Sequence, residues 1–235
     1  MLLRLALKRS KFVSRPNRFL LIAESGGELL KLHNRNTGRL GELLRAGAEL
    51  FYVPRDADRS SPTVGTLIGV STDEGIALID PPTQARAFEY AWRSGCVNWL
   101  NRWYLVGKEV KVCDVRLDYE MLGPRGKVGY LELKSAVYLD PLGRCSYPDV
   151  PSERGLRHVR TLKAIRRRGV RAVMALVAAH PSCRSFRPFV ERHPELASEF
   201  MRASEAGVEI RALKVVLSRE GCVSLVEPDL PVLLT

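Results

Sequence analysis

Apolar and polar residues alternate in short segments over the first third of the chain, and this pattern predicts β-strands. The predicted strands cover residues 2–7 running towards Val13, then 19–24, 28–33, 48–53 and 64–70. Ser25-Gly26-Gly27 separates the second strand from the third, and glycines at such a point are typical of a tight hairpin turn. Closely spaced strands with one helical turn at residues 40–44 favour a small barrel of the OB type, whose open face often binds single-stranded nucleic acid.

A different pattern begins after Asp80-Pro81-Pro82, where proline disfavours helix in the preceding residue and marks a boundary between two domains. Helices are predicted at residues 83–98, with Thr83 as the N-cap, and at 152–168 and 194–206. Strands are predicted at residues 103–112, 115–119, 130–135, 171–179 and 208–218. The fourth of these is apolar almost throughout, as in a buried parallel strand. The expected fold class is mixed α/β: an N-terminal OB-like β-barrel, residues 1–82, followed by a mixed-sheet domain, residues 83–235.

Two carboxylates and one lysine stand out in the central pair of predicted strands. Side chains alternate along a strand, so Glu132 and Lys134 point to the same face. In a hairpin of suitable register, Asp118 lies opposite them with β-carbons roughly 5 Å apart. Two such carboxylates can share a divalent cation, and an ammonium beside the ion can orient or deprotonate a bound water. The pattern therefore predicts metal-dependent phosphodiester cleavage; the alternative is that Glu132 and Lys134 simply face solvent on a half-buried sheet.

The charge balance points to a polyanionic partner. Lys and Arg number 37 against 26 for Asp and Glu, a formal net charge of +11, and 28 of the 37 are arginine, whose planar guanidinium suits phosphate oxygens. Genome composition or thermal adaptation would also enrich arginine. The five cysteines are widely separated, which argues against a zinc ribbon or a secreted disulfide scaffold. No apolar run reaches the length of a membrane span, so we expect a cytoplasmic protein that does not bind membranes.

The order of elements after residue 82 resembles the core of PD-(D/E)xK nucleases, with Asp118 as the first acid and Glu132-x-Lys134 as the second motif. Leu117 stands where that motif has proline, and the literal Pro148-Asp149 pair comes too late in the chain to be the first acid. Several segments in register resemble the sugar fermentation stimulation protein family. The matching stretches are Arg15-Pro16-Asn17-Arg18-Phe19-Leu20, Asn36-Thr37-Gly38-Arg39, Arg116-Leu117-Asp118-Tyr119, Leu131-Glu132-Leu133-Lys134-Ser135, Tyr147-Pro148-Asp149 and Ser152-Glu153-Arg154-Gly155-Leu156-Arg157-His158.

This resemblance implies an OB-like domain followed by a PD-(D/E)xK-type domain, DNA binding, regulation of sugar-utilisation genes and a metal-dependent nuclease activity. The leading interpretation is a Mg²⁺- or Mn²⁺-dependent nuclease. In it Asp118 and Glu132 hold the metal, together with the Leu133 carbonyl, and Lys134 positions the attacking water. Glu153 or Glu89 is a further candidate carboxylate. The residues expected to hold phosphates are Arg18, Arg39, Arg154 and Arg157, with His158 orienting one of them.

Two other interpretations remain open from the sequence. One is a non-catalytic DNA-binding regulator of sugar-catabolism genes, which would use the same basic surface without cleavage. The other is an RNA-binding accessory protein, because an OB-like face accepts either backbone; DNA is the favoured partner. The intact acids favour the enzyme, since two carboxylates beside phosphates repel the ligand unless a cation lies between them.

Overall fold

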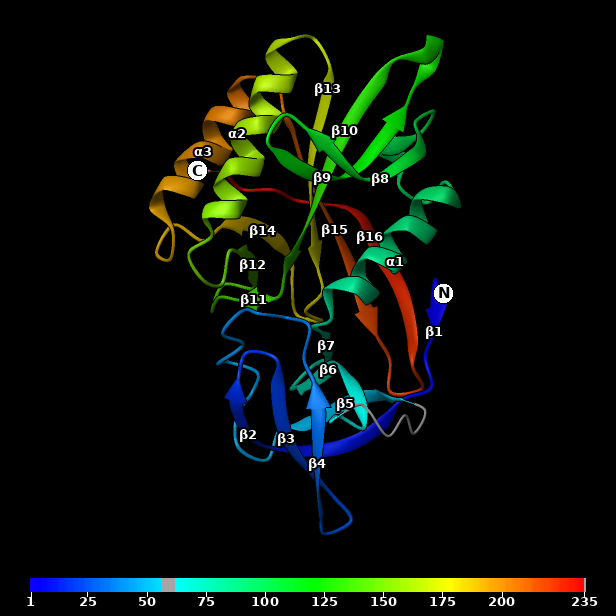
Figure 1. Cartoon of the computed structure of the whole chain (residues 1–235), viewed down its shortest axis with the longest axis vertical. Coiled ribbons are helices and arrows are strands. Elements are labelled where there is room, and N and C mark those ends of the chain that lie inside the picture. The colour runs from blue at the N-terminus through cyan, green and yellow to red at the C-terminus, as the bar shows by residue number, and fades with distance from the viewer. Residues whose placement is uncertain (56–61, 235) are drawn as a thin grey trace.

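The computed structural model of the chain describes residues 1–55 and 62–234, and its first half is a closed barrel (Figure 1). The barrel strands are β2 (Lys8–Asn17), β3 (Leu20–Ser25), β4 (Glu28–His33), β5 (Glu49–Pro54) and β6 (Gly65–Thr72). Strands β5, β2, β3 and β4 pair antiparallel in that order, β6 pairs antiparallel with β5, and a parallel pairing of β4 with β6 closes the ring. Gly26 and Gly27 take positive φ at the β3–β4 turn, as the hairpin requires. The predicted OB-like barrel is confirmed.

The barrel is joined to the rest of the molecule through backbone pairing as well as through the chain itself. Strand β7 (Gly75–Leu78) pairs with β6 on one side and with β15 (Glu209–Leu217) on the other. At the other end, β1 (Leu3–Arg4) pairs with β16 (Cys222–Leu230), so the predicted first strand is divided between the two halves. Its residues 5–7 cross from one half to the other and form no strand. The division of the chain into folding units at residue 82 stays a prediction.

The second half is built around a mixed sheet. It consists of β8 (Tyr104–Val112), β9 (Val115–Leu122), β10 (Val128–Ala136), β13 (Arg171–Ala178), β15 and β16. The three central strands β10, β13 and β15 run parallel to one another, and β8, β9 and β16 are antiparallel to their neighbours. A small separate sheet contains β11 (Tyr138–Leu139), β12 (Arg144–Tyr147) and β14 (Ser185–Pro188), and a disulfide joins Cys145 of β12 to Cys183.

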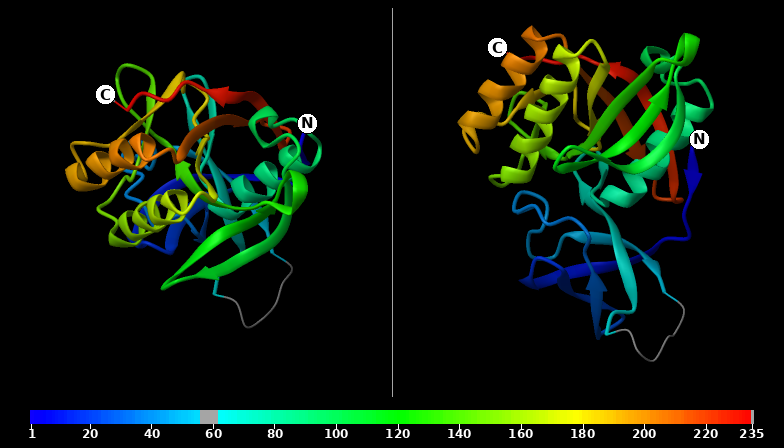
Figure 2. Two further views of the ribbon diagram at one scale, coloured as in Figure 1. Left: turned by 90° about the horizontal axis from the view of Figure 1, so that it is seen from above. Right: turned by 45° about the horizontal axis from the view of Figure 1, so that its top comes forward.

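Helices cover both faces of this sheet (Figure 2). α2 (Glu153–Arg167) and α3 (Pro194–Glu205) pack side by side on one face, where Leu156, Leu162 and Phe200 share an apolar cluster with Met174 of β13. α1 (Pro81–Arg93) lies on the opposite face, and its Phe88 belongs to the cluster that continues into the barrel. Helices cover both faces of strand β13, and this explains why its side chains are apolar on both faces. The predicted mixed-sheet domain is confirmed. Among the described residues, no helix combines the length and apolar character that crossing a membrane requires.

Helix α1 begins earlier and ends earlier than the sequence predicted. Asp80, and not Thr83, is the N-cap: its Oδ2 accepts from the backbone N–H of Thr83 at 3.0 Å and from the Thr83 hydroxyl at 2.6 Å. Pro81 and Pro82 occupy the first turn, where a missing N–H costs nothing because that group has no partner within the helix. The helix ends at Arg93, and residues 98–100 form a separate 3₁₀ turn. Pro81 and Pro82 therefore begin the helix, and the domain boundary expected at this point stays a prediction.

The Asp80 carboxylate also holds the barrel against α1. Its side chain is fully buried, and Arg35 from the loop after β4 donates to both oxygens, Nε to Oδ1 at 2.8 Å and Nη2 to Oδ2 at 2.6 Å. One carboxylate thus caps a helix and accepts two parallel hydrogen bonds from one arginine, which is the strongest geometry for an arginine–carboxylate pair. This buried charge is therefore one of the contacts that join the two halves.

We expect Asp80→Ala to lower the free energy of unfolding by about 3–5 kcal/mol, because it removes the cap and leaves the Arg35 guanidinium without its buried partner. Asp80→Asn keeps a capping oxygen and should lose less. Urea unfolding followed by circular dichroism measures both variants. Equal stability of wild type and Asp80→Ala would contradict the assignment of this pair as the joint.

Candidate metal centre

The regular pairing of β9 with β10 ends next to two acidic residues. The last paired residues are Tyr119 and Leu131. Beyond them, the Leu133 N–H donates to Asp118 Oδ2 at 2.7 Å, and the Asp118 N–H donates to Glu132 Oε2 at 3.2 Å. Each carboxylate thus accepts from the other strand's backbone in place of a carbonyl. The strands separate at this point, and the two acids lie together in the gap.

Strand β9 changes the face that it buries at Asp118. Leu117 packs in the cluster beneath α2, whereas Tyr119, two residues later, packs beneath α1 with its ring 5.9 Å from that of Phe88 and 6.0 Å from that of Trp92. In a flat strand, residues two apart face the same side. The change of face at Asp118 turns its carboxylate towards β10.

Glu132 is enclosed by protein groups. It has no exposed surface, and its Oε1 contacts both Lys134 Nζ, two residues along the same strand face, and Nδ1 of His158 on α2. The Lys134 side chain is itself only 14% exposed. The alternative that these two charges merely face solvent is therefore excluded by their burial.

The three charges are unequally stabilised. Burial and, secondarily, the negative charge of Glu132 raise the pKa of Asp118 to about 6. Burial also pushes the pKa of Glu132 upwards, but the hydrogen bond from His158 and the charge of Lys134 outweigh it and bring that pKa below its usual value. The pKa of Lys134 is lowered by burial and raised more strongly by Glu132, so the amine stays an ammonium. Asp118 is the carboxylate whose negative charge lacks compensation.

The donor set fits a hard cation better than a structural zinc. In the ranges 1–55 and 62–234, no three His, Cys, Asp or Glu side chains gather closely enough to form a complete metal site. Mg²⁺ and similar ions, however, keep several waters and use only one or two carboxylates. Asp118 and Glu132 supply two, and the charge of Asp118 is the kind that a cation relieves. These two residues would hold the ion.

A cavity of about 370 Å³ opens at Asp118 and Lys134, and the fully buried Glu132 does not line it. It is lined by Asp118, Tyr119, Leu133, Lys134 and Ser135, by Lys108 and Glu109 of β8, and by residues of α1 that include Glu89. Glu89, a further candidate carboxylate, accepts from the Tyr119 hydroxyl at 3.1 Å and from Lys108 Nζ at 2.5 Å. The other candidate, Glu153, is exposed in the first turn of α2 and does not line this cavity.

Lys108 was missed in the sequence, although a signal for it exists. It lies directly opposite Tyr119 in the pairing of β8 with β9, one residue from Asp118. If the predicted strands at 103–112 and 115–119 pair across a tight turn, Lys108 lies opposite Tyr119 and therefore beside Asp118.

The arginines predicted to hold phosphates fall into two groups. Arg18 and Arg39 are exposed on the barrel, Arg18 with its guanidinium 4.8 Å from the centre of the Phe19 ring, and neither lines the cavity at Asp118. Arg154 and Arg157 are exposed on α2. Arg157 borders a groove of about 310 Å³ that also contains Arg160 and Arg168.

His158 is placed differently from its predicted role. It is 2% exposed, and both ring nitrogens contact protein groups, Nδ1 the Glu132 carboxylate and Nε2 the Arg154 Nε at 3.4 Å. This arrangement gives it no direct access to a phosphate. The structure assigns it to the acidic pair instead.

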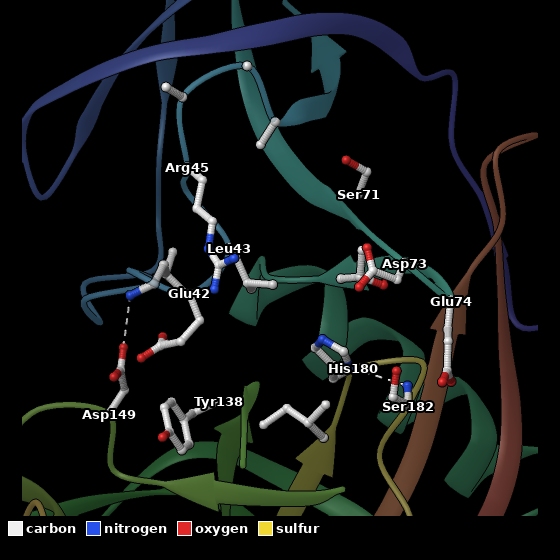
Figure 3. Close-up of a pocket in the computed structure, with 16 residues that line it drawn as sticks. Glu42, Leu43, Arg45, Ser71, Asp73, Glu74, Tyr138, Asp149, His180 and Ser182 are labelled. Atoms are coloured by element: carbon white, nitrogen blue, oxygen red, sulfur yellow. Dashed lines mark hydrogen bonds between the residues drawn. The ribbon is translucent and has the colours of Figure 1, made fainter. Parts of the chain in front are cut away.

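The literal Pro148-Asp149 pair lies elsewhere, as its position in the chain indicated. Asp149 Oδ2 accepts from the backbone N–H of Leu40 at 2.9 Å, and the residue borders a cleft of about 590 Å³. In Figure 3, this cleft lies between Glu42 and Arg45 of the barrel and Tyr138 of the second half. Asp149 therefore links the two halves and takes no part in the site at Asp118.

Comparison with known proteins places the chain in a family. Residues 83–221 match the family described as the sugar fermentation stimulation protein RE domain, and residues 13–79 match its N-terminal OB domain. The chain belongs to the sugar fermentation stimulation protein family. A family member from Archaeoglobus fulgidus is 36% identical over 224 residues, covering 95% of this chain and 94% of the relative. One from Pyrococcus furiosus is 32% identical over 210 residues and covers 89% of each.

A solved structure from this family has the same fold. The Pyrococcus furiosus protein SfsA, determined in complex with Ca²⁺, superimposes with a TM-score of 0.92 at 31% identity. The match covers 99% of this chain and 98% of the other. The family resemblance inferred from sequence segments is thus confirmed, together with the order of the OB and mixed-sheet parts.

The raised pKa of Asp118 predicts a pH-dependent stability. Folding raises this pKa from 3.8 to about 6, so the folded state holds the proton more tightly and loses stability as pH rises through that window. Above pH 6, the ionised Asp118 lowers the free energy of unfolding of the metal-free protein by about 3 kcal/mol at most. Asp118→Asn should therefore be more stable than wild type in EDTA at pH 7.5, and close to wild type at pH 4.

Urea unfolding in EDTA at the two pH values measures this difference. Asp114→Asn is the matched control, because Asp114 is exposed in the turn between β8 and β9 and should change little. A destabilisation by Asp118→Asn that is the same at both pH values would show that Asp118 is an ordinary structural carboxylate.

Proposed function

We propose that the protein is a divalent-metal-dependent nuclease that acts on DNA, with Asp118 and Glu132 as ligands of Mg²⁺ or Mn²⁺. The observation that carries this proposal is a pair of neighbouring carboxylates beside a buried ammonium, with Asp118 and Lys134 lining a cavity and Glu132 buried next to them. The related Pyrococcus furiosus structure was determined with Ca²⁺, which belongs to the same class of oxygen-preferring cations.

Each residue has a distinct task in this reaction. A bound metal would supply Lewis-acid stabilisation of the phosphate and lower the pKa of a water. Asp118 and Glu132 supply carboxylate oxygens from two different strands. Lys134 remains protonated beside Glu132, so it acts as a hydrogen-bond donor that orients the attacking water or offsets charge on the phosphate. Glu89 and Lys108, which share the cavity, form an ion pair at 2.5 Å that borders the substrate's approach.

The basic surface supports a nucleic acid as substrate. A net charge of +11 attracts a polyanion at long range, and arginines are exposed on both the barrel and α2. We favour DNA over RNA, with Arg18, Arg39, Arg154 and Arg157 as phosphate contacts. The barrel would hold the backbone while the sheet domain carries the reaction.

A second candidate function is supported by the completeness of the charge network at Glu132. Its carboxylate already accepts from Lys134, His158 and the Asp118 N–H without a metal. A DNA-binding regulator of sugar-catabolism genes that does not cleave would keep such a network as structural support. Only the uncompensated charge of Asp118 argues against this role.

Cleavage by site variants separates the two functions. We expect Asp118→Asn to abolish metal-dependent cleavage while DNA binding in EDTA is unchanged or tighter, because one repelling charge is gone. Lys134→Met should keep metal binding but slow cleavage by roughly 100-fold. Plasmid and oligonucleotide cleavage with Mg²⁺ or Mn²⁺, run beside calorimetric metal titration, measures both effects, and Asp114→Asn serves as the control.

Two outcomes would count against the nuclease. Wild-type protein that binds DNA yet cleaves no substrate with either metal would favour the regulator. Cleavage that persists unchanged in Asp118→Asn and Lys134→Met would indicate a contaminating enzyme and remove the site assignment.

Salt dependence tests the nucleic-acid surface independently of cleavage. Affinity in EDTA should fall steeply with KCl concentration, since phosphate contacts release condensed counterions. Arg39→Ala and Arg157→Ala should each reduce the slope by about one contact. Arg211→Ala is the control and should leave the slope unchanged, because Arg211 already pairs with Glu209 and Asp229. Filter binding over a KCl series gives the slopes, and a wild-type slope near zero would rule out this surface.

A further inference from the structure

Tyr138 on β11 lies at the border of two cavities. It lines both the cleft of about 590 Å³ between the two halves and a second cavity of about 400 Å³. Its ring stacks on that of Phe189, with the ring centres 4.3 Å apart and the ring planes inclined by 29°. Phe189 is buried, so it supports the tyrosine from within the protein. In Figure 3 the Tyr138 side chain lies in the cleft opposite Glu42 of the barrel. Tyr138 therefore presents a supported aromatic surface to both cavities.

The smaller cavity carries a net positive charge. Its lining contains three arginines, which are Arg144 of β12, Arg187 of β14 and Arg192. Its two carboxylates already have partners, because Asp140 accepts from Arg144 Nε at 2.6 Å and Glu191 accepts from Arg187. Three guanidinium groups against two paired carboxylates leave one positive charge. We call this space the arginine cavity.

Two arginines of this cavity retain hydrogen-bond donors for a ligand. Arg187 Nε is buried and has no hydrogen-bond partner in the ranges 1–55 and 62–234. Leaving such a donor without a partner costs free energy. Arg192 forms no ion pair within the same ranges, and its guanidinium lies 5.5 Å from the centre of the Phe189 ring that also supports Tyr138. Several guanidinium donors around one cavity suit a phosphate, which offers charged acceptor oxygens to more than one arginine.

The larger cleft has the opposite charge. Among the described residues, its lining contains one arginine, Arg45, and four carboxylates, those of Glu42, Asp73, Glu74 and Asp149. His180 adds no charge at neutral pH, because burial lowers its pKa to about 4. Such a cleft repels phosphate but accepts an uncharged nucleobase, whose amino groups are hydrogen-bond donors for carboxylates. Its volume lies within the range of small-molecule sites. The two cavities thus separate a base from its phosphate on either side of Tyr138.

We propose that Tyr138 and the arginine cavity bind one unpaired nucleotide of the nucleic-acid substrate, with the base stacked on Tyr138 in the acidic cleft and the phosphate held by the three arginines. A base inside a duplex is paired and is stacked between its neighbours, so its face is not available to a tyrosine. The site therefore selects a substrate that contains a single-stranded segment. This inference rests on the nucleic-acid substrate of the proposed function and requires neither metal nor cleavage.

The nucleotide site is close to the candidate metal centre along the chain. Strand β11 follows β10 after one residue, and Tyr138 is four residues beyond Lys134. Four residues span about 14 Å at most. One strand of a duplex advances about 3.4 Å per nucleotide, so this distance corresponds to about four nucleotides at most. The unpaired nucleotide is therefore expected within a few positions of the bond that is cleaved.

Binding in EDTA tests the site without cleavage. Fluorescence anisotropy with full-length protein compares a short labelled DNA single strand with the duplex of the same sequence. Tyr138→Leu keeps an apolar cover on Phe189 but has no aromatic face, and it should weaken binding of the single strand about 10-fold while binding of the duplex is unchanged. Arg192→Met keeps a long stem over Phe189 and should weaken the single strand several-fold. Arg184→Met is the matched control, because Arg184 is exposed just before β14 and lines neither cavity.

Three binding results would overturn the site. One is a single-strand affinity that is the same in wild type, Tyr138→Leu and Arg192→Met. Another is an equal loss of affinity for single strand and duplex in these variants, since no unpaired base would then be required. The third is binding of the mononucleotide dTMP as tightly as the single strand, which would indicate a site for free nucleotides. Failure of wild type to bind either DNA would instead overturn the nucleic-acid function on which the site rests.

Photochemical cross-linking locates the base directly and does not depend on variant stability. A single strand that carries 5-iodouracil forms a covalent bond to an aromatic residue on which the modified base stacks. Mass spectrometry should find Tyr138 in the cross-linked peptide, and the duplex should give no such product. Tyr138→Phe keeps the ring and should retain the cross-link. Cross-links confined to the barrel, for example at the exposed Phe19, would overturn the assignment of Tyr138.

Discussion

The burial of the Glu132 carboxylate is the constraint on which the rest of the site depends. A charge without solvent needs several donors, and Glu132 finds them on three different segments: the backbone of β9, Lys134 on its own strand and His158 on α2. These bonds hold the three segments in one position relative to one another. They also explain why Asp118 carries the uncompensated charge, because Lys134 is already bound to Glu132 and Lys108 is bound to Glu89. The site therefore has one negative charge, that of Asp118, that no protein cation balances among the described residues.

The two halves of the molecule share more than a connecting segment. Strand β7, which follows the barrel, pairs with β15 of the central sheet, and β1 from the start of the chain pairs with β16. The apolar cluster around Phe88 extends from the barrel into the second half, and the buried pair of Arg35 with Asp80 lies at the joint. A nucleic acid that contacts arginines on both halves therefore meets a surface whose parts are held in a defined relation. This continuity suits the proposed function, in which the barrel holds the nucleic-acid backbone and the sheet domain carries the reaction.

Local pattern was sufficient for much of the fold. The alternation of apolar and polar residues predicted the barrel strands, and Gly26 and Gly27 predicted the hairpin between two of them. Both signals are local, because strand periodicity and a positive φ depend on only a few neighbouring residues. The same alternation correctly put Glu132 and Lys134 on one face. The apolar stripe of α2 and the apolar run of β13 likewise indicated what each would bury. Six short segments in register were enough to identify the family.

Other features were decided only by contacts between distant parts of the chain. Asp80 became the cap of α1 because Arg35, 45 residues earlier, neutralises it in the interior. The start of the chain pairs with β16, so that the first and the last strands of the chain lie side by side. Asp118 faces β10 because helices on opposite sides of the sheet bury Leu117 and Tyr119. His158, which in the sequence resembles a surface residue among arginines, is buried because the apolar face of α2 packs on the strand that holds Glu132. Sequence alone determined which acids and which lysine are present and how they alternate; the tertiary structure decided which of them are buried, which are paired and which one is left with an uncompensated charge, since burial and pairing depend on residues far away along the chain.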